Sequence, residues 1–229
     1  ARIASRVAEP LRRRFFDAYK GPNSGLQQVD AFICNHPPAL CELYMPFNKS
    51  IMVMASVNLE FTRENNERFK EWVHNLQLIA KDPRNVVAAN NYYDLEYIRF
   101  FTGIEPYYVP AYCGYVKPAD YKPNNNVVLF ARNHHNPSHH YNALKKAAQR
   151  RGFKKYSFTR TEDQYRKGFE YTDLATHPAF VMIPSTKSVM SRVENYRMNI
   201  PIFIPSVKLL TDWELKEHII HERVYWKGT

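Results

Sequence analysis

The strongest constraint on the fold is a pair of short apolar runs, each ending in Pro-Ser, that enclose one helical segment. The runs are residues 180–183 (FVMI) and 202–204 (IFI), within the stretch 179–206. Brief runs that are apolar on both faces and closed by turn residues are typical of buried parallel strands. The stretch therefore predicts a strand, a polar turn, a helix and a second strand parallel to the first.

The polar turn of this unit consists of Ser185, Thr186, Lys187 and Ser188. A turn in this position lies at the carboxyl end of the first strand, where open α/β sheets bind ligands. Hydroxyl groups, free backbone N–H groups and one cation suit a phosphate. Simple N-capping of the following helix by Ser185 or Thr186 explains the same residues. The sequence leaves both readings open.

Strands and helices alternate along the rest of the chain, which predicts parallel βαβ units and an α/β fold. The expected strands are 29–34, 50–55, 85–89, 105–110, 127–130 and 155–158, and the expected helices are 1–20, 64–81, 92–101, 141–151, 162–169 and 207–220. The pattern predicts two Rossmann-like domains with parallel sheets. The first half begins with a helix where a full domain of this type begins with a strand, so we expect the N-terminal domain to be reduced or truncated.

A polar stretch with two prolines, residues 117–126, interrupts the alternation. We interpret it as a linker between an N-terminal domain, residues 1–116, and a C-terminal domain, residues 124–229. Two such halves are expected to form a ligand cleft between the carboxyl ends of their sheets.

The formal net charge of +10 is concentrated in residues 121–160, which contain no Asp or Glu. The basic residues of this stretch are Lys122, Arg132, Lys145, Lys146, Arg150, Arg151, Lys154, Lys155 and Arg160. A patch of this kind attracts nucleic acid, a nucleotide or an acidic glycan. A solvated helix face is the alternative explanation.

The second half resembles the donor-binding domain of GT-B glycosyltransferases, over roughly residues 124–215. Glu194 stands seven residues before Pro201, which opens the apolar run 202–204, and Arg132 follows the strand expected at 127–130. The resemblance implies that Glu194 accepts hydrogen bonds from the ribose hydroxyls of a nucleotide and that Arg132 faces the donor phosphates. Many members of the family have a second acid eight residues before the glutamate, where this chain has Thr186. That departure weakens the likeness to the retaining members with two glutamates.

The resemblance implies a hexosyltransferase that uses a nucleotide sugar, needs no cofactor or bound metal, and glycosylates a hydroxyl acceptor that the sequence does not identify. His36 and Glu60, each after an expected strand of the first half, are rival candidates for the base that deprotonates the acceptor. A turn histidine beside two prolines, and a salt bridge of Glu60 with Arg63, are the structural alternatives. The rival function is a non-catalytic, transferase-like module that binds acidic glycan or nucleic acid through residues 121–160.

Other functional signals in the sequence are weaker. His134, His135, His139 and His140 form a cluster, but the spacing around Pro137 does not keep them on one helix face. Loop histidines therefore fit better than a metal site. No Rossmann glycine motif, P-loop, serine-hydrolase elbow or zinc-protease motif is present.

The sequence places the chain in no compartment. It has no run of 18 apolar residues and begins without a signal peptide, so we expect no membrane-spanning segment within it. Asn48-Lys49-Ser50 matches a glycosylation sequon. The secretory pathway or Golgi lumen is favoured if an anchor lies upstream, and the cytoplasm otherwise.

Overall fold

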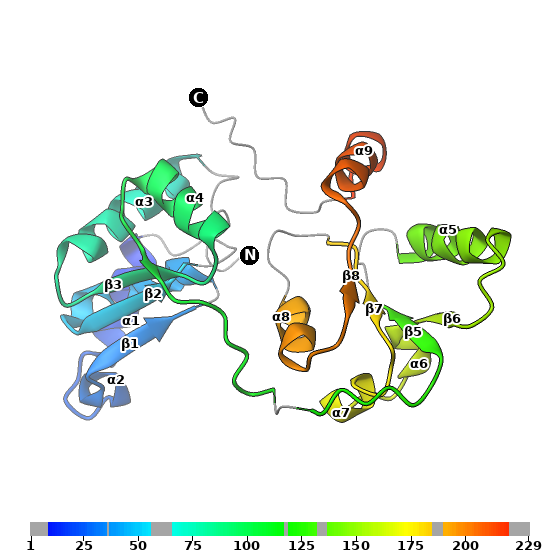
Figure 1. Cartoon of the computed structure of the whole chain (residues 1–229). Helices are drawn as coiled ribbons and strands as arrows, with labels where there is room; N and C mark the ends of the chain where they lie inside the picture. The colour runs from blue at the N-terminus through cyan, green and yellow to red at the C-terminus, as the bar shows by residue number, and fades with distance from the viewer. Residues whose placement is uncertain are drawn as a thin grey trace. The chain divides into compact units, whose positions relative to one another are not determined.

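The chain folds into two compact units, Ala1–Ala111 and Tyr112–Thr229, each built on its own four-stranded parallel sheet (Figure 1). The structure is a computed structural model, and it describes residues 9–35, 37–55, 66–116, 119–131, 137–184 and 190–219. The expectation of an α/β fold with two parallel sheets is confirmed. Each unit is described separately below.

The sheet of the first unit has the strand order β1-β2-β3-β4, so each strand pairs with the next one along the chain. Its strands are β1 (Ala31–Cys34), β2 (Ser50–Met54), β3 (Val86–Ala89) and β4 (Tyr107–Tyr108). Phe32 lies opposite Ile51, and Val53 lies opposite Val87. All four side chains are buried, so these strands supply one side of the core.

Helices precede and connect the strands of the first unit. They are α1 (Glu9–Tyr19), α2 (Gly25–Gln28), the 3₁₀ segments η2 (Pro38–Leu43) and η3 (Met45–Phe47), α3 (Asn66–Lys81) and α4 (Tyr92–Thr102). Trp72, Leu76 and Ile79 of α3 recur at helical spacing and are buried. Asn91 caps the N-terminus of α4, and Gly103 ends it at a φ of 68°, which glycine adopts without a Cβ clash. Helices α3 and α4 pack side by side over β3 (Figure 1).

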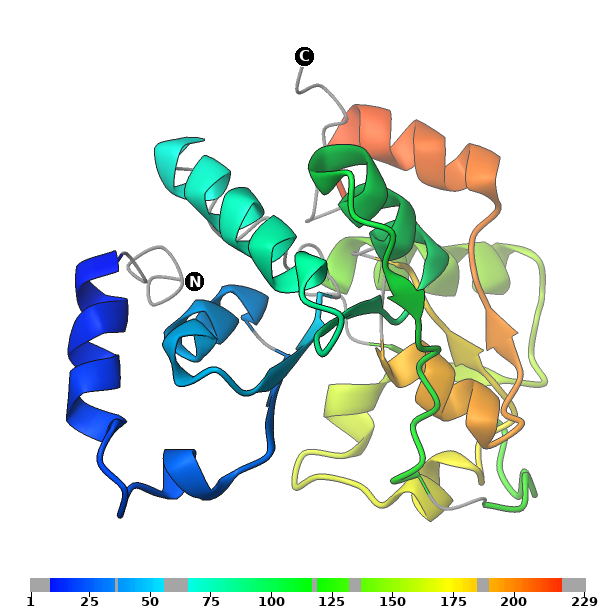
Figure 2. The same cartoon turned by 90° about the vertical axis from the view of Figure 1, so that its left-hand side faces the viewer.

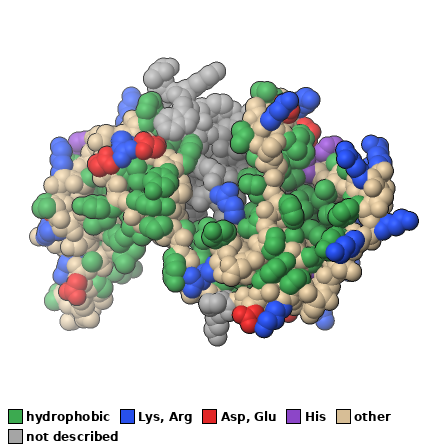
Figure 3. Space-filling view, in the orientation of Figure 1, with side chains coloured by type: hydrophobic (Ala, Val, Ile, Leu, Met, Phe, Trp, Pro, Cys, Tyr) green, Lys and Arg blue, Asp and Glu red, His purple; other side chains and the backbone are tan. Residues whose placement is uncertain are grey.

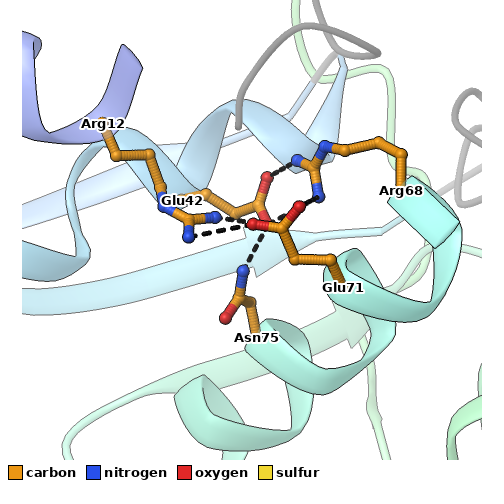
Figure 4. A network of polar contacts seen from close by, with 5 residues as sticks. All are labelled: Arg12, Glu42, Arg68, Glu71 and Asn75. Atoms are coloured by element: carbon orange, nitrogen blue, oxygen red, sulfur yellow. Dashed lines mark hydrogen bonds and ion pairs between the residues drawn. The ribbon is translucent and has the colours of Figure 1, made fainter. Parts of the chain in front are cut away.

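A buried ionic network joins α1, η2 and α3 (Figure 4). The Glu42 carboxylate is fully buried and accepts from both terminal nitrogens of Arg68, from Arg12 at 3.2 Å and from Asn75 at 2.7 Å. Arg12 also pairs with Glu71 at 3.0 Å. Burial raises the pKa of the Glu42 carboxyl, while Arg68 and Asn75 act in the opposite direction. The network fixes the positions of the three segments relative to one another.

The sheet of the second unit has the order β6-β5-β7-β8, and all of its strands are parallel. Its strands are β5 (Val127–Phe130), β6 (Ser157–Arg160), β7 (Phe180–Val181) and β8 (Ile202–Phe203). Leu129 of β5 lies opposite Phe180 of β7, and both are buried. Strand β5 is therefore central, although it comes first in the unit.

The two faces of the second sheet carry different helices, and Figures 1 and 2 show α8 on one face and α5 on the other. The helices are α5 (Pro137–Arg150), α6 (Thr161–Gln164), α7 (Tyr171–Leu174), α8 (Met190–Arg197) and α9 (Val207–Glu217). On the α8 face, Leu129 and Phe180 pack with Leu174 and Met198. On the α5 face, Phe130 and Ile183 pack beneath the α9 region.

The segment expected to be a linker is part of the second unit. Cys113 and Val116 are buried in the core of the α8 face, and the Tyr121 hydroxyl donates to the Pro178 carbonyl at 2.7 Å. The backbone N–H groups of Lys122 and Asn124 donate to carbonyls at the end of α7. The boundary between the units therefore falls before Tyr112, whereas the proline content of residues 117–126 indicated a later position.

Candidate functional site

The most distinctive position in the second unit is at the carboxyl ends of β5 and β7. These strands are neighbours, but the next strand along the chain lies on one side of the sheet for β5 and on the other side for β7. From β5 the chain crosses to β6 through α5, and from β7 it crosses to β8 through α8. Because α5 and α8 cover opposite faces, the chain passes to opposite faces of the sheet after the neighbouring strands β5 and β7 (Figure 1). Such a topological switch point is where open α/β sheets bind ligands.

Two of the loops predicted to bind the donor start at this switch point. The Ala131 N–H donates to the Val181 carbonyl at 2.8 Å, so the chain leaves β5 and β7 side by side. Arg132 comes directly after Ala131, and the turn 185–188 comes directly after Pro184. Arg132, Ser185, Thr186, Lys187 and Ser188 themselves lie outside the described residues.

The two candidate bases follow adjacent strands of the first sheet. His36 comes two residues after β1 ends, and Glu60 belongs to the connection after β2. Since β1 and β2 are parallel neighbours, both connections leave from the same edge of that sheet. His36 and Glu60 also lie outside the described residues, so their roles stay predictions.

Glu194 is a described member of the predicted site, and tyrosine hydroxyl groups hold its carboxylate. It lies in the middle of α8, half-buried, and its Oε1 accepts from the Tyr171 hydroxyl at 3.1 Å and from the Tyr115 hydroxyl. Both hydrogen bonds end on one carboxylate oxygen, although a carboxylate has lone pairs on two. The contacts fix the side chain and connect α8 with α7 and with the segment after Tyr112.

The hydroxyl groups that hold Glu194 resist ionisation. The hydrogen bond to Glu194 is the largest contribution that raises the pKa of Tyr115. For Tyr171, burial raises the pKa first, and the nearby Glu194 charge adds to it. Both groups therefore remain hydrogen-bond donors at neutral pH.

The sequence did not indicate these partners. From the sequence alone, Glu194 could instead pair on the helix surface with a nearby cation, Arg192 or Arg197. Arg197 instead donates from Nε to the Val116 carbonyl at 2.9 Å, and its guanidinium lies 4.2 Å from the centre of the Tyr112 ring. Tyr115 is 79 positions from Glu194, and no local pattern relates them. A contact of this kind becomes visible only when the segment 112–116 is seen to pack on α8.

The predicted basic patch resolves into one compact group on α5 and the turn after it. Lys122 and Arg160, at the ends of the stretch, pair with Asp120 and Asp163 respectively. The remaining described basic residues are all exposed: Lys145, Lys146, Arg150, Arg151, Lys154 and Lys155. This group, which we call the α5 basic patch, lies on the second unit.

The histidine cluster shows no metal-site geometry in the part of the chain that the structure describes, where no group of three or more His, Cys, Asp or Glu side chains could hold a metal ion. His140 is buried against Trp213, with ring centres 4.3 Å apart, and its Nε2 lies 3.5 Å from a Glu217 carboxylate oxygen. His134 and His135 lie outside the described residues. His140 is therefore a packing residue of the α5–α9 contact.

No protein-family model, curated protein or solved structure matches the chain. The likeness to the GT-B donor domain therefore rests on the spacing of Glu194, Pro201 and Arg132. Within the described residues, none of the helices has the length and apolar character needed to cross a bilayer.

Proposed function

We propose that the chain is a GT-B-type glycosyltransferase that binds a nucleotide sugar at the carboxyl edge of its second sheet. The observation that carries the proposal is the switch point between β5 and β7, from which the Arg132 loop and the 185–188 turn both start. Phosphate groups bind where backbone N–H groups and cations converge at the start of a helix. Arg132 and residues 185–188, which follow the two adjacent strand ends in sequence, would bring that combination to this edge of the sheet.

The proposed chemistry needs an anion site more than a nucleophile. The acceptor hydroxyl attacks the anomeric carbon, and the nucleoside diphosphate leaves with its bonding electrons. Cations and N–H groups that stabilise this leaving anion contribute strongly to catalysis. Arg132 and Lys187 would supply the charge, and Ser185, Thr186 and Ser188 would supply hydroxyl and backbone donors.

Glu194 has the chemistry of a ribose ligand in this scheme. A carboxylate accepts from two hydroxyl groups at once, and charge-assisted hydrogen bonds of this type are the stronger ones. Tyr115 and Tyr171 both bind Oε1, so they orient the carboxylate while Oε2 keeps its own acceptor capacity. The tyrosines would then act as positioning residues for Glu194.

The acceptor side of the proposal involves the first unit. His36 or Glu60 would take the proton of the acceptor hydroxyl as it attacks, which is general base catalysis. The two candidates predict different pH profiles, because an unperturbed histidine titrates about two pH units above a glutamate. Single variants His36→Gln and Glu60→Gln, assayed for sugar transfer, separate these roles.

Isothermal titration of the whole chain with UDP, GDP and ADP tests the proposal. We expect one of the three to bind at a single site and to be displaced by its nucleotide sugar. Arg132→Gln and Lys187→Gln should each weaken that binding, whereas Lys70→Gln on the first unit should not. If the chain binds none of the nucleotides, the proposal is overturned.

A second candidate function is favoured by the α5 basic patch. Six exposed cations on one helix and its following turn form a surface that attracts polyanions without any catalytic group. In this case the chain is a transferase-like module that binds acidic glycan or nucleic acid. Salt-sensitive retention on heparin or oligonucleotide by a chain that binds no nucleotide would support it.

A further inference from the structure

The face of the second sheet that carries α5 contains a large apolar groove. The groove has a volume of about 750 Å³. Its floor is formed by Val128, Phe130, Phe158, Ala179, Val181, Ile183 and Phe203, which come from all four strands of the sheet. The groove lies wholly within the second unit.

Two helices border the groove. Ala143, Leu144 and Ala147 of α5 form one wall, and Leu209 and Trp213 of α9 close the end nearest the carboxyl ends of the strands. Ala143 and Ala147 are small and exposed, so this wall of α5 is shallow and open to an incoming chain.

Large apolar side chains of the groove remain in water. Phe203 is 62% exposed, Ile204 54% and Phe153 52%. Parallel sheets are usually covered on both faces, and their strands are then apolar throughout. Strands β7 and β8 have this apolar composition, although one face of the sheet is open at the groove in the described part of the chain. In Figure 3, hydrophobic side chains fill the area over β7 and β8 below α9. Contiguous apolar surface of this kind marks an interaction site.

The dimensions of the groove match one α-helix. The floor from β5 across β7 to β8 spans two strand spacings, or about 10 Å. A helix with its side chains is about 10–12 Å wide. Along the strands the floor runs from Ala179 to Ile183, about 13 Å at the rise of a β-strand, which corresponds to about nine residues of helix.

The charge on the α5 side of the groove has one sign, because α5 contains no Asp or Glu. Lys146 and Arg150 follow Ala143 and Ala147 respectively by one helical step of three residues, so they lie next to the open wall on α5. Arg151 and Lys154 continue the positive edge at the end of the helix. Blue side chains border the hydrophobic area at α5 in Figure 3. An occupant with negative charge on the flank facing α5 is therefore favoured.

We propose that this groove binds an amphipathic α-helix of a partner protein, with the apolar stripe of the helix on the floor and its acidic residues beside Lys146 and Arg150. A groove lined this way is typical of helix-in-groove recognition. In this mode the bound helix places apolar side chains at positions i, i+3, i+4 and i+7 into the groove. A flat membrane surface does not fill a concave floor between two helices. The groove uses none of the residues of the proposed nucleotide site, although Phe130 and Ile183 of its floor lie two residues before Arg132 and Ser185.

A synthetic 16-residue peptide tests the proposal against the whole chain by fluorescence anisotropy. The peptide carries leucines at the four anchor positions, glutamates along one flank and helix-forming residues elsewhere. A second peptide has the same composition with the leucines spread around the helix, and a third has lysines in place of the glutamates. We expect both to bind at least tenfold more weakly than the first.

A matched pair of variants locates the binding. Ala147→Glu introduces a long charged side chain into the wall of the groove, whereas Asn142→Glu makes the same charge change on the opposite side of α5. Both sites are exposed and helical, so both variants should fold, which circular dichroism checks. We expect Ala147→Glu to weaken peptide binding at least tenfold and Asn142→Glu to leave it within twofold after correction for salt.

Four results would overturn the proposal. If the scrambled peptide binds as tightly as the first peptide, the groove does not recognise an amphipathic helix. If the Ala147→Glu variant binds the first peptide as tightly as the wild-type chain does, the peptide does not bind in the groove. A concentration-dependent dimer that Ala147→Glu dissociates, measured by light scattering, identifies a second copy as the occupant. A fluorescent fatty acid can also be bound to the chain and challenged with competitors. If other fatty acids release it and the peptide does not, an acyl chain is the occupant of the groove.

Discussion

The Nδ1 atom of His177 lies 2.8 Å from the carbonyl oxygen of Val127, the first residue of the central strand β5. A carbonyl oxygen only accepts, so Nδ1 carries the proton and Nε2 accepts from the Tyr165 hydroxyl at 2.7 Å. His177 is almost fully buried, and burial lowers its pKa below the ordinary value, although the hydrogen bond to Val127 opposes the shift. The folded second unit therefore holds His177 in its neutral form.

This relationship predicts an acid-sensitive contribution to stability. Well above about pH 6.5, His177 is neutral in both the folded and the unfolded chain, and the contribution is fully present. As the pH falls below that value the unfolded chain takes up the proton first, so the free energy of unfolding falls by at most about 1.4 kcal/mol per pH unit. Urea unfolding between pH 7.5 and pH 5 measures the slope. The His177→Gln variant should show a smaller dependence of the free energy of unfolding on pH. An unchanged slope would contradict the assignment of His177 as a buried neutral group.

Glu194→Gln should weaken nucleotide binding about ten- to a hundredfold, since a charge-assisted hydrogen bond contributes about 1.5–3 kcal/mol. Tyr171→Phe removes a donor that orients Glu194, so it should weaken binding less than Glu194→Gln does. Isothermal titration with the nucleotide that the wild-type chain binds measures both. Glu162→Gln, on the same unit, serves as the control. Unchanged affinity in Glu194→Gln would leave Glu194 with only its structural contacts.

Replacing Lys145, Lys146, Arg150 and Arg151 together by Gln should weaken retention on heparin or oligonucleotide. Nucleotide affinity should remain largely intact, because these residues lie on α5 and in the turn after it, outside the two connections that start at the switch point. Retention should also fall as salt rises, since exposed charges are screened within about 8 Å at physiological ionic strength. A control with the same charge change replaces the exposed Lys20, Lys70, Lys81 and Lys216. A collapse of nucleotide affinity would mean that the α5 basic patch and the donor site are one.

Glu42→Gln should destabilise the first unit by about 3–5 kcal/mol, the usual cost of breaking a buried ion pair from one side. The change keeps the shape of the side chain but removes the negative charge that binds both terminal nitrogens of the buried Arg68, whose pair with Glu71 is longer, at 3.4 Å. Urea unfolding, followed by a probe in the first unit, measures the effect. Glu67→Gln, which removes an exposed pair with Lys70, should change little. Equal effects of the two substitutions would contradict the role of the network.

Much of the fold follows from local signals. Residues 127–130 were predicted as a strand and form β5. The prediction holds because a short apolar run between polar turns usually forms a buried strand. Helix α4 begins at Tyr92, as predicted, and ends just before Gly103. The helix expected at 162–169 is only the single turn α6, and β7 has only two residues of the expected 180–183. Lengths of this kind depend on which neighbouring strand or helix is present, and no local pattern carries that information.

The candidate site also has features that the sequence predicts and features that it does not. The strand order β6-β5-β7-β8 places residues 132 and 185–188 after neighbouring strands, and the alternation of strands and helices predicted that both follow parallel strands; ligand binding there stays a prediction. The contacts of Glu194 were not predictable, because they depend on Tyr115, from the segment 112–116, and on Tyr171, from α7, which was not predicted as a helix. The groove between α5 and α9 was also missed, since runs read as buried strands leave Phe203 and Ile204 exposed.

The attachment of residues 112–126 to the second unit decides how the chain can be divided for separate study. A fragment that begins at residue 124 discards Cys113 and Val116, which are buried beside Leu129 and Met198, and it removes the Tyr115 hydroxyl from Glu194. Such a fragment would expose core side chains to water and aggregate, whatever its nucleotide site can do. A fragment that begins at Ala111 keeps these contacts, so a division at this point leaves the core of the α8 face and the setting of Glu194 intact.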